Sequence, residues 1–235
     1  MSMTSVLRMM RIKGDFRALI TGLAVSVALL LAACMPRRED DYAARYHVLA
    51  AKNEDFGKAV DALESGLLTP DGRRQIARSL ERALARSPMS TSDESIIKTL
   101  LASVYLPGID AKGLADCQKA KQYSSSALVL DPKSVKALEI DVAADMCLAH
   151  ASGSFDALIG RLESFRKAGK YYVGLYIALS GAYEERSERT NNYADLLKAR
   201  EAWDLAKAMR EPIVGSLAWE RRAAELDEEL RKRKP

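Results

Sequence analysis

Residues 117–132, CQKAKQYSSSALVLDP, decide the fold that we expect for this chain. Ala120, Ser124 and Ala127 follow one another at steps of four and three residues, so they share one face of a helix. A stripe of small side chains lets a second helix pack closely against this face. Pro132 then ends the helix, because proline lacks the backbone N–H that a helix interior uses. The stretch therefore predicts one helix of a tightly packed helical pair.

Helical periodicity recurs along most of the chain, and no stretch alternates with period two for long enough to predict a sheet. Ala, Leu, Glu, Lys and Arg are abundant and aromatic residues make up only 6% of the chain, a composition that favours helix throughout. We therefore expect an all-α protein whose last helix covers 213–234. The expected apolar faces hold Tyr42, Tyr46, Leu49 and Ala50, then Phe56, Val60 and Leu63, then Ile76, Leu80, Ala83 and Leu84, and then Ile96, Ile97, Leu100, Leu101 and Val104.

Two segments repeat one pattern. Leu101-Ala102-x-x-Tyr105 precedes the small-residue stripe, and Tyr176-x2-Leu179-Ser180-x2-Tyr183 precedes Ala199-x3-Trp203-x2-Ala206 and Pro212. These segments resemble the tetratricopeptide repeat, in which two helices pack through small residues and a proline closes the unit. The resemblance implies antiparallel helix-pair repeats that form a tetratricopeptide-like superhelix, with each pair burying its apolar face against its neighbours.

The spacing departs from the family pattern. The step from the last tyrosine of the first helix to the first alanine of the second is 15 residues in one segment and 16 in the other, where an ordinary repeat has roughly nine. We therefore expect insertions between the paired helices, near Pro107–Gly113 and Ser187–Asn192. An irregular helical bundle with chance matches of alanine and proline is the alternative.

A middle unit matches the pattern more weakly, and no proline closes it. Its first helix holds Leu138, and a break at His150–Gly153 separates its two helices. The closing prolines at 88, 132 and 212 are spaced so that the missing end falls near Ala168-Gly169. Its second helix holds Phe155, Ala157, Leu158 and Leu162.

The segment Leu31-Ala32-Ala33-Cys34 ends an apolar stretch that begins at Ala18. Basic residues precede that stretch and small residues end it, which is typical of a secretory signal. A cysteine directly after Leu-Ala-Ala resembles the lipobox of bacterial lipoproteins. The resemblance implies that the chain is cut before Cys34 and that acyl chains on Cys34 anchor it to a membrane.

The lipobox resemblance sets the expected organisation of the chain: a signal peptide over 1–33, a lipidated tether over 34–41, and a helical tetratricopeptide-like repeat domain over 42–235. Met35 stands where an Asp tends to retain Gram-negative lipoproteins in the inner membrane, so we expect the outer membrane, facing the periplasm. The alternatives are a transmembrane helix, for which the apolar run is short, and a cleaved signal without lipidation.

The charge pattern and the two histidines exclude several function classes. The net charge of +4 resides mostly in the signal, so the rest of the chain is close to neutral and we expect no nucleic acid partner. His47 and His150 are expected to be exposed or capping residues rather than general bases. Neither a catalytic constellation nor metal-ligand spacing appears, so we expect no enzyme, no cofactor and no metal. We interpret Glu184-Glu185, Arg73-Arg74 and Arg221-Arg222 as solvated surface charge.

Cys117 and Cys147 lie 15 residues before and after Pro132. In an antiparallel helical hairpin, equal distances from the turn place two residues at the same height. Because the periplasm is oxidising, we predict a disulfide between these cysteines. Two buried free thiols are the alternative.

The tyrosines give the clearest functional indication. Tyr176 and Tyr183 match repeat positions and are expected in the core. Tyr171 and Tyr172 have no such place and are candidates for partner contacts, with a purely structural role as the alternative. We expect a lipid-anchored periplasmic scaffold that binds envelope proteins or peptides through a helical-repeat groove. A ligand-binding accessory component of a solute transporter is the alternative function.

Overall fold

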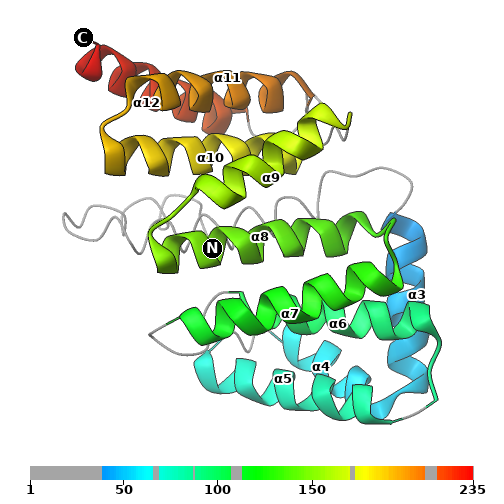
Figure 1. Ribbon diagram of the computed structural model, residues 1–235. Helices are drawn as coiled ribbons and strands as arrows, with labels where there is room; N and C mark the ends of the chain where they lie inside the picture. Colours follow the sequence, from blue (N-terminus) through cyan, green and yellow to red (C-terminus); the bar gives the residue numbers. More distant parts are fainter. Residues whose placement is uncertain are drawn as a thin grey trace, which may run out of the picture. The chain divides into compact units, whose positions relative to one another are not determined.

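The computed structural model describes residues 39–65, 69–86, 88–106, 113–169, 173–209 and 216–234. Within these residues the chain forms ten α-helices and no strand (Figure 1), which confirms the expected all-α class. Cys34, Tyr171 and Tyr172 lie outside the described residues. The helices are α3 (Glu39–Lys52), α4 (Glu54–Glu64), α5 (Pro70–Ala85), α6 (Thr91–Tyr105), α7 (Leu114–Leu130), α8 (Val135–Ser152), α9 (Asp156–Lys167), α10 (Val173–Thr190), α11 (Tyr193–Met209) and α12 (Ser216–Arg233).

Helices that follow one another along the chain pack against one another. The most extensive contacts join α10 to α11, α6 to α7 and α7 to α8. Short turns link α7 to α8 and α10 to α11, so each of these two pairs is antiparallel. Helix α8 packs more extensively on α7 than on α9, although the repeat pattern pairs it with α9. The weak middle unit of the sequence is therefore also the most loosely paired one in the structure.

Two clusters of buried apolar side chains hold the helices together. The first cluster draws on α3 to α8, with Phe56 and Leu80 among its largest fully buried members. The second draws on α8 to α12 and includes Phe155 and Leu226. Helix α8 serves both clusters, since Ala144 belongs to the first while Val142 and Ala149 belong to the second.

Side-chain caps fix where several helices begin. Asn53 separates α3 from α4, and its side chain accepts a hydrogen bond of 3.1 Å from the backbone N–H of Phe56. Ser134 begins α8 in the same way, by accepting from the backbone N–H of Ala137 at 3.1 Å. Thr69 caps α5, and Pro70 occupies the first turn, where its missing N–H costs nothing. The apolar pattern over residues 42–63 therefore spans two helices that the cap at Asn53 divides.

The ends of α8 and α9 lie where the sequence places them. Gly153 ends α8 in the left-handed conformation, with φ of 76°. Helix α9 stops at Lys167, and Gly169 follows with φ of 72°, which confirms the stop expected near Ala168-Gly169. Glycine suits both turns because it has no Cβ to clash at positive φ.

The expected insertion at Ser187–Asn192 is instead an extension of a helix. Helix α10 continues to Thr190, and only Asn191 and Asn192 form the turn to α11. Asn191 adopts a left-handed conformation with φ of 52°, and the Ser187 hydroxyl donates to the carbonyl of Asn192 at 2.7 Å. The 16 residues between Tyr183 and Ala199 therefore include additional turns of α10 in place of an inserted loop. Most of the other expected insertion, near Pro107–Gly113, lies outside the described residues.

The final helix also agrees with the sequence, because α12 buries Ala223 and Leu226 and then ends in charged residues. None of the helices in the described part of the chain is both long and apolar enough to cross a membrane.

Candidate partner-binding surfaces

A disulfide joins α7 to α8. Cys117 and Cys147 are bonded across the hairpin, with their Cα atoms 5.6 Å apart. Cys117 is buried on the same face as Ala120, Ser124 and Ala127, which are all buried against the neighbouring helices. The predicted pairing of the two cysteines is confirmed, and the bond fixes the register of α7 on α8.

A charge network lies beside this disulfide, between α7, α8 and α9. At its centre is Asp141, whose side chain is only 1% exposed. One carboxylate oxygen accepts from the hydroxyls of Ser124 and Ser125, both at 2.8 Å, and the other accepts from the Lys121 ammonium at 2.8 Å. The buried carboxylate is thus held by side chains that lie on α7.

Arg161 of α9 completes the charge network. Its guanidinium pairs with Asp141 and with Asp145, and Lys121 also reaches Asp145 at 2.8 Å. Burial alone would raise the pKa of Asp141, but hydrogen bonds from Lys121, Ser124 and Ser125 outweigh burial and hold that pKa below its usual range. Two cations balance two carboxylates, and the network links α7, α8 and α9.

The sequence did not reveal this network. Ser124 was recognised only as a small residue in the packing stripe, yet it also donates to the buried carboxylate. Lys121, Asp141 and Asp145 were not singled out, although a buried Asp must find partners wherever it lies on an apolar helix face. The charged residues Asp141 and Asp145 at i and i+4 on α8 were the available signal.

A second set of carboxylates lies on α10, facing α12. Glu184 and Glu185 were interpreted as solvated, but their side chains are only 16% and 17% exposed. Glu184 pairs with Arg222 of α12. Burial raises the pKa of Glu184 to about 7, and the nearby carboxylates Glu188 and Glu185 add to the rise while Arg222 opposes it. The interpretation of this stretch as surface charge was therefore wrong.

A groove of about 330 Å³ opens between α9, α10 and α11, and we refer to it as the α9–α11 groove. Leu179, Ala202 and Leu205 are its apolar lining residues. Leu205 is 37% exposed and offers most of the apolar surface, whereas Leu179 and Ala202 are buried. Charged side chains surround this surface. The charged residues that line the groove are Glu163, Arg166 and Lys167 of α9 with Lys198 and Glu201 of α11.

Tyr183 forms part of the wall of the α9–α11 groove. Its ring is buried, as expected for a repeat position, while its hydroxyl donates to Glu163 at 2.9 Å. Burial and then this hydrogen bond raise the pKa of Tyr183 to about 12, so the hydroxyl stays protonated at physiological pH. The Lys198 ammonium lies 5.3 Å from the centre of the ring, within range of a cation–π contact. The tyrosine thus contacts both Glu163 of α9 and Lys198 of α11 across the groove wall.

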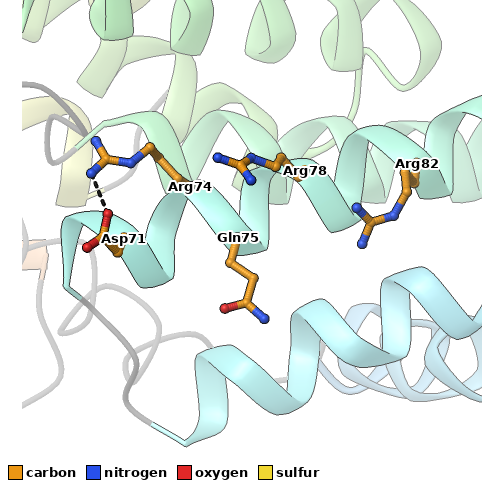
Figure 2. Close-up of a pocket in the computed structure, with 5 residues that line it drawn as sticks. All are labelled: Asp71, Arg74, Gln75, Arg78 and Arg82. Atoms are coloured by element: carbon orange, nitrogen blue, oxygen red, sulfur yellow. Dashed lines mark hydrogen bonds and ion pairs between the residues drawn. The ribbon is translucent and has the colours of Figure 1, made fainter.

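A pocket of about 480 Å³ lies along α5 and is lined by Asp71, Arg74, Gln75, Arg78 and Arg82 (Figure 2). Arg74 pairs with Asp71 at 2.5 Å. Arg82 donates to the buried carboxylate of Asp55 at 3.2 Å. We call the arginines at positions 74, 78, 82 and 86 the arginine ridge. The interpretation of Arg73-Arg74 as surface charge does not identify the arginine ridge. The four-residue spacing of its arginines was the signal in the sequence that could have revealed it.

Neither histidine lines the α9–α11 groove or the pocket along α5, although the His150 imidazole lies 3.8 Å from the Glu185 carboxylate. His47 is exposed on α3. His150 is half-buried, packs edge-on against Phe155 with ring centres 5.1 Å apart, and has a pKa lowered by burial and by Arg189. Across the described ranges, no group of three or more His, Cys, Asp and Glu side chains is placed to hold a metal ion.

Comparison with protein-family models, with curated proteins and with solved structures finds no match to this chain. The assignment of a role therefore depends on the surfaces described above and on the sequence patterns.

Proposed function

We propose that this protein is a lipid-anchored periplasmic scaffold that binds protein or peptide partners through the α9–α11 groove. The observation that carries the proposal is the partly exposed Leu205 inside a rim of both signs of charge in one groove. Protein interfaces have this composition, with an apolar centre and a polar rim. The tetratricopeptide-like repeat, which we retain as a proposal, binds partners with such grooves.

The groove suits a polypeptide better than a small ligand. Small-molecule sites are concave, mostly apolar and able to bury most of the ligand. Charged residues line much of the α9–α11 groove, and its apolar surface is limited to a few side chains, so a ligand there would keep much of its surface in water. A peptide can place an apolar side chain on Leu205 while its charges meet Lys198 and Glu201. Neither pocket described here supports the alternative role in solute transport.

The lipid anchor would give the scaffold its location. Acylation at Cys34 would confine the domain to the membrane surface, because each buried methylene contributes about 0.8 kcal/mol. Confinement raises the effective concentration of any partner that is held at the same membrane. Metabolic labelling with radioactive palmitate tests this part: the wild-type chain should take up label, and Cys34→Ala should take up none.

Site-specific photo-crosslinking in intact cells tests the groove. A photoreactive amino acid at Leu205 should give a discrete crosslinked product, because this side chain lies in the groove and is partly exposed. Adding Lys198→Glu should weaken that product, since it reverses a charge on the groove wall. The same amino acid at Val129, an exposed position on α7 outside the groove, is the matched control and should give no such product. Equal products from the two positions, insensitive to Lys198→Glu, would contradict the proposal.

A further inference from the structure

We propose that the arginine ridge of α5 is a second binding site, specific for an acidic segment of a polypeptide. The ridge lies on a helix that contributes no residue to the α9–α11 groove, so the inference goes beyond the function proposed above. Its basis is the spacing of the arginines, the way neighbouring carboxylates hold Arg74, Arg82 and Arg86, and the exposed Arg78 between Arg74 and Arg82.

The arginines are evenly spaced along the helix. Arg74, Arg78 and Arg82 follow one another at four-residue steps, and Arg86 continues the series at the end of α5. Each step is a rise of about 6 Å, so the three helical guanidinium groups span about 12 Å. Residues at this spacing form a single row on the helix surface. The row therefore presents repeated positive charge along one line.

Two carboxylates hold the arginines on either side of Arg78. Asp71 pairs with Arg74. Asp55 of α4 is buried, and its two carboxylate oxygens pair with the guanidinium groups of Arg82 at 3.2 Å and Arg86 at 2.8 Å. Side chains that are already fixed lose little conformational entropy when they bind a ligand. Asp55 thus places two guanidinium groups at the surface and keeps them there.

Arg78 is the arginine that this arrangement leaves open to a ligand. It is exposed, lines the pocket, and forms no hydrogen bond or ion pair with any other described residue. The nearest carboxylate on its own helix face, Glu81, accepts a hydrogen bond from the Tyr105 hydroxyl at 3.0 Å. Figure 2 shows the Arg78 guanidinium between those of Arg74 and Arg82. A carboxylate bound there would meet positive charge on both sides.

The chemistry of the ridge selects carboxylates on a regular peptide. The planar guanidinium group forms two parallel hydrogen bonds with one carboxylate. Carboxylates at i and i+4 of a helix repeat every 6 Å or so, and alternate residues of a strand repeat at about 6.7 Å, so either backbone can match the row. The Gln75 amide also lines the pocket and can both donate to and accept from a peptide.

A bilayer fits this surface less well. Helices that lie in a membrane interface present exposed Trp, Phe or Leu side chains beside their basic residues. The apolar face of α5 is instead buried in the protein core, through Ile76, Leu80 and Ala83. The side chains that line the pocket along the ridge are all charged or polar, so none of them could enter the acyl layer of a bilayer.

Binding of defined peptides to the purified full chain tests the inference. The probe is a fluorescent alanine-based helical peptide with glutamate at every fourth position, and its reference has glutamine at those positions. The glutamate peptide should bind and the glutamine peptide should not. Arg78→Glu should weaken binding by roughly tenfold or more, because it places like charges together. Binding should also fall as salt is added, since exposed charges are screened.

The matched control is Arg221→Glu, which makes the same change in net charge at an exposed arginine of α12. It should leave binding of the glutamate peptide unchanged. A peptide with lysine in place of its central glutamate should bind Arg78→Glu better than it binds the wild type. Helicity and the midpoint of thermal unfolding, measured for each variant and for Arg78→Gln, confirm that the fold is retained.

Three results would overturn the inference. One is equal binding of the glutamate peptide by the wild type and Arg78→Glu. Another is an equal loss in Arg78→Glu and Arg221→Glu, which would indicate attraction by net charge alone. The last is sedimentation with phosphatidylglycerol vesicles that depends on Arg78 while the peptide fails to bind, which would assign the ridge to the membrane. None of these results bears on the proposed function of the α9–α11 groove, because crosslinking at Leu205 tests that function independently.

Discussion

The α7–α8 hairpin and the α10–α12 end of the domain bury carboxylates in opposite ways. In the hairpin, Asp141 is almost fully buried and is met by two cations and two hydroxyls. Its pKa lies below the usual range because these partners outweigh its burial. At the other end, Glu184 is slightly less buried and has one cation, Arg222, among several carboxylates. Its pKa rises to about 7.

The comparison shows that burial raises the pKa of both carboxylates, and that the number of their partners sets the two pKa values apart. Burial disfavours the charged form of both carboxylates, and only for Asp141 do hydrogen bonds and ion pairs outweigh that effect. The hairpin is also cross-linked by the disulfide between Cys117 and Cys147. Helix α12 is held to α10 and α11 by ion pairs and by the stacking of Trp203 on Trp219, with ring centres 4.6 Å apart. One region is therefore insensitive to pH near neutrality, and the other is poised to respond to it.

The largest effect that we predict comes from removing the charge of Asp141. Asp141→Asn should lower the free energy of unfolding by about 3–5 kcal/mol at pH 7, because it leaves two cations facing an uncharged buried group. Urea denaturation followed by circular dichroism measures the change. The loss should shrink below pH 3.8, since the stabilisation by a carboxylate with a lowered pKa disappears as pH falls through its native value.

Asp71→Asn is the control for Asp141→Asn. Asp71 also pairs with an arginine, but its side chain is 91% exposed, so the substitution should change the free energy of unfolding by less than about 0.5 kcal/mol. Comparable losses in the two variants would mean that the balanced charges of the hairpin contribute no more than a surface ion pair.

The second prediction removes the covalent part of the hairpin. The double substitution Cys117→Ala and Cys147→Ala should lower the free energy of unfolding by about 3 kcal/mol, because the disulfide closes a loop with a sequence separation of 30 residues. Reduction of the wild type should give a similar loss. Thermal unfolding under oxidising and reducing conditions measures both, and the double variant should not respond to the reductant. An unchanged wild type after reduction would show that the charge network alone holds α7 on α8.

The hairpin was predictable from the sequence because its determinants are periodic. The stripe at Ala120, Ser124 and Ala127 places one face of α7 in contact with its neighbours, and the turn at Pro132 makes α8 antiparallel to it. Two cysteines at equal distances from that turn must then lie opposite each other, as they do. Helix ends at Gly153 and Lys167 followed from turn residues in the same way.

Charge partners could not be predicted in this way. Arg161 reaches Asp141 from a different helix, and which side chain of α9 faces α8 depends on how the two helices cross. Likewise, Glu184 is buried because α12 returns to cover α10, which no local pattern in residues 184–185 records. The groove arises from three helices at once, and for that reason no local pattern in the sequence indicated Leu205 or placed Tyr183 in a groove wall.

The smallest effect that we predict is the pH dependence that Glu184 gives to the α10–α12 end. Because its native pKa of about 7 lies above its usual value of 4.5, the native state binds more protons between these values. The stabilisation of the native state by protonated Glu184 is complete below pH 4.5, and it is lost as the pH rises through about 7. The free energy of unfolding should therefore fall by about 2 kcal/mol from pH 5 to pH 8 through this group, since each pKa unit corresponds to about 1.4 kcal/mol.

Glu184→Gln should remove this part of the pH dependence and make the variant more stable than the wild type at pH 8. Urea denaturation at a series of pH values measures the difference between the two proteins, which isolates Glu184 from Glu185 and Glu188 and from His150, whose lowered pKa acts with the opposite sign. Glu220→Gln, at an exposed position on α12 paired with Lys207, should keep the wild-type pH dependence. If Glu184→Gln and the wild type run parallel from pH 5 to pH 8, then Arg222 compensates Glu184 as fully as Lys121 and Arg161 compensate Asp141, and the contrast between the two regions disappears.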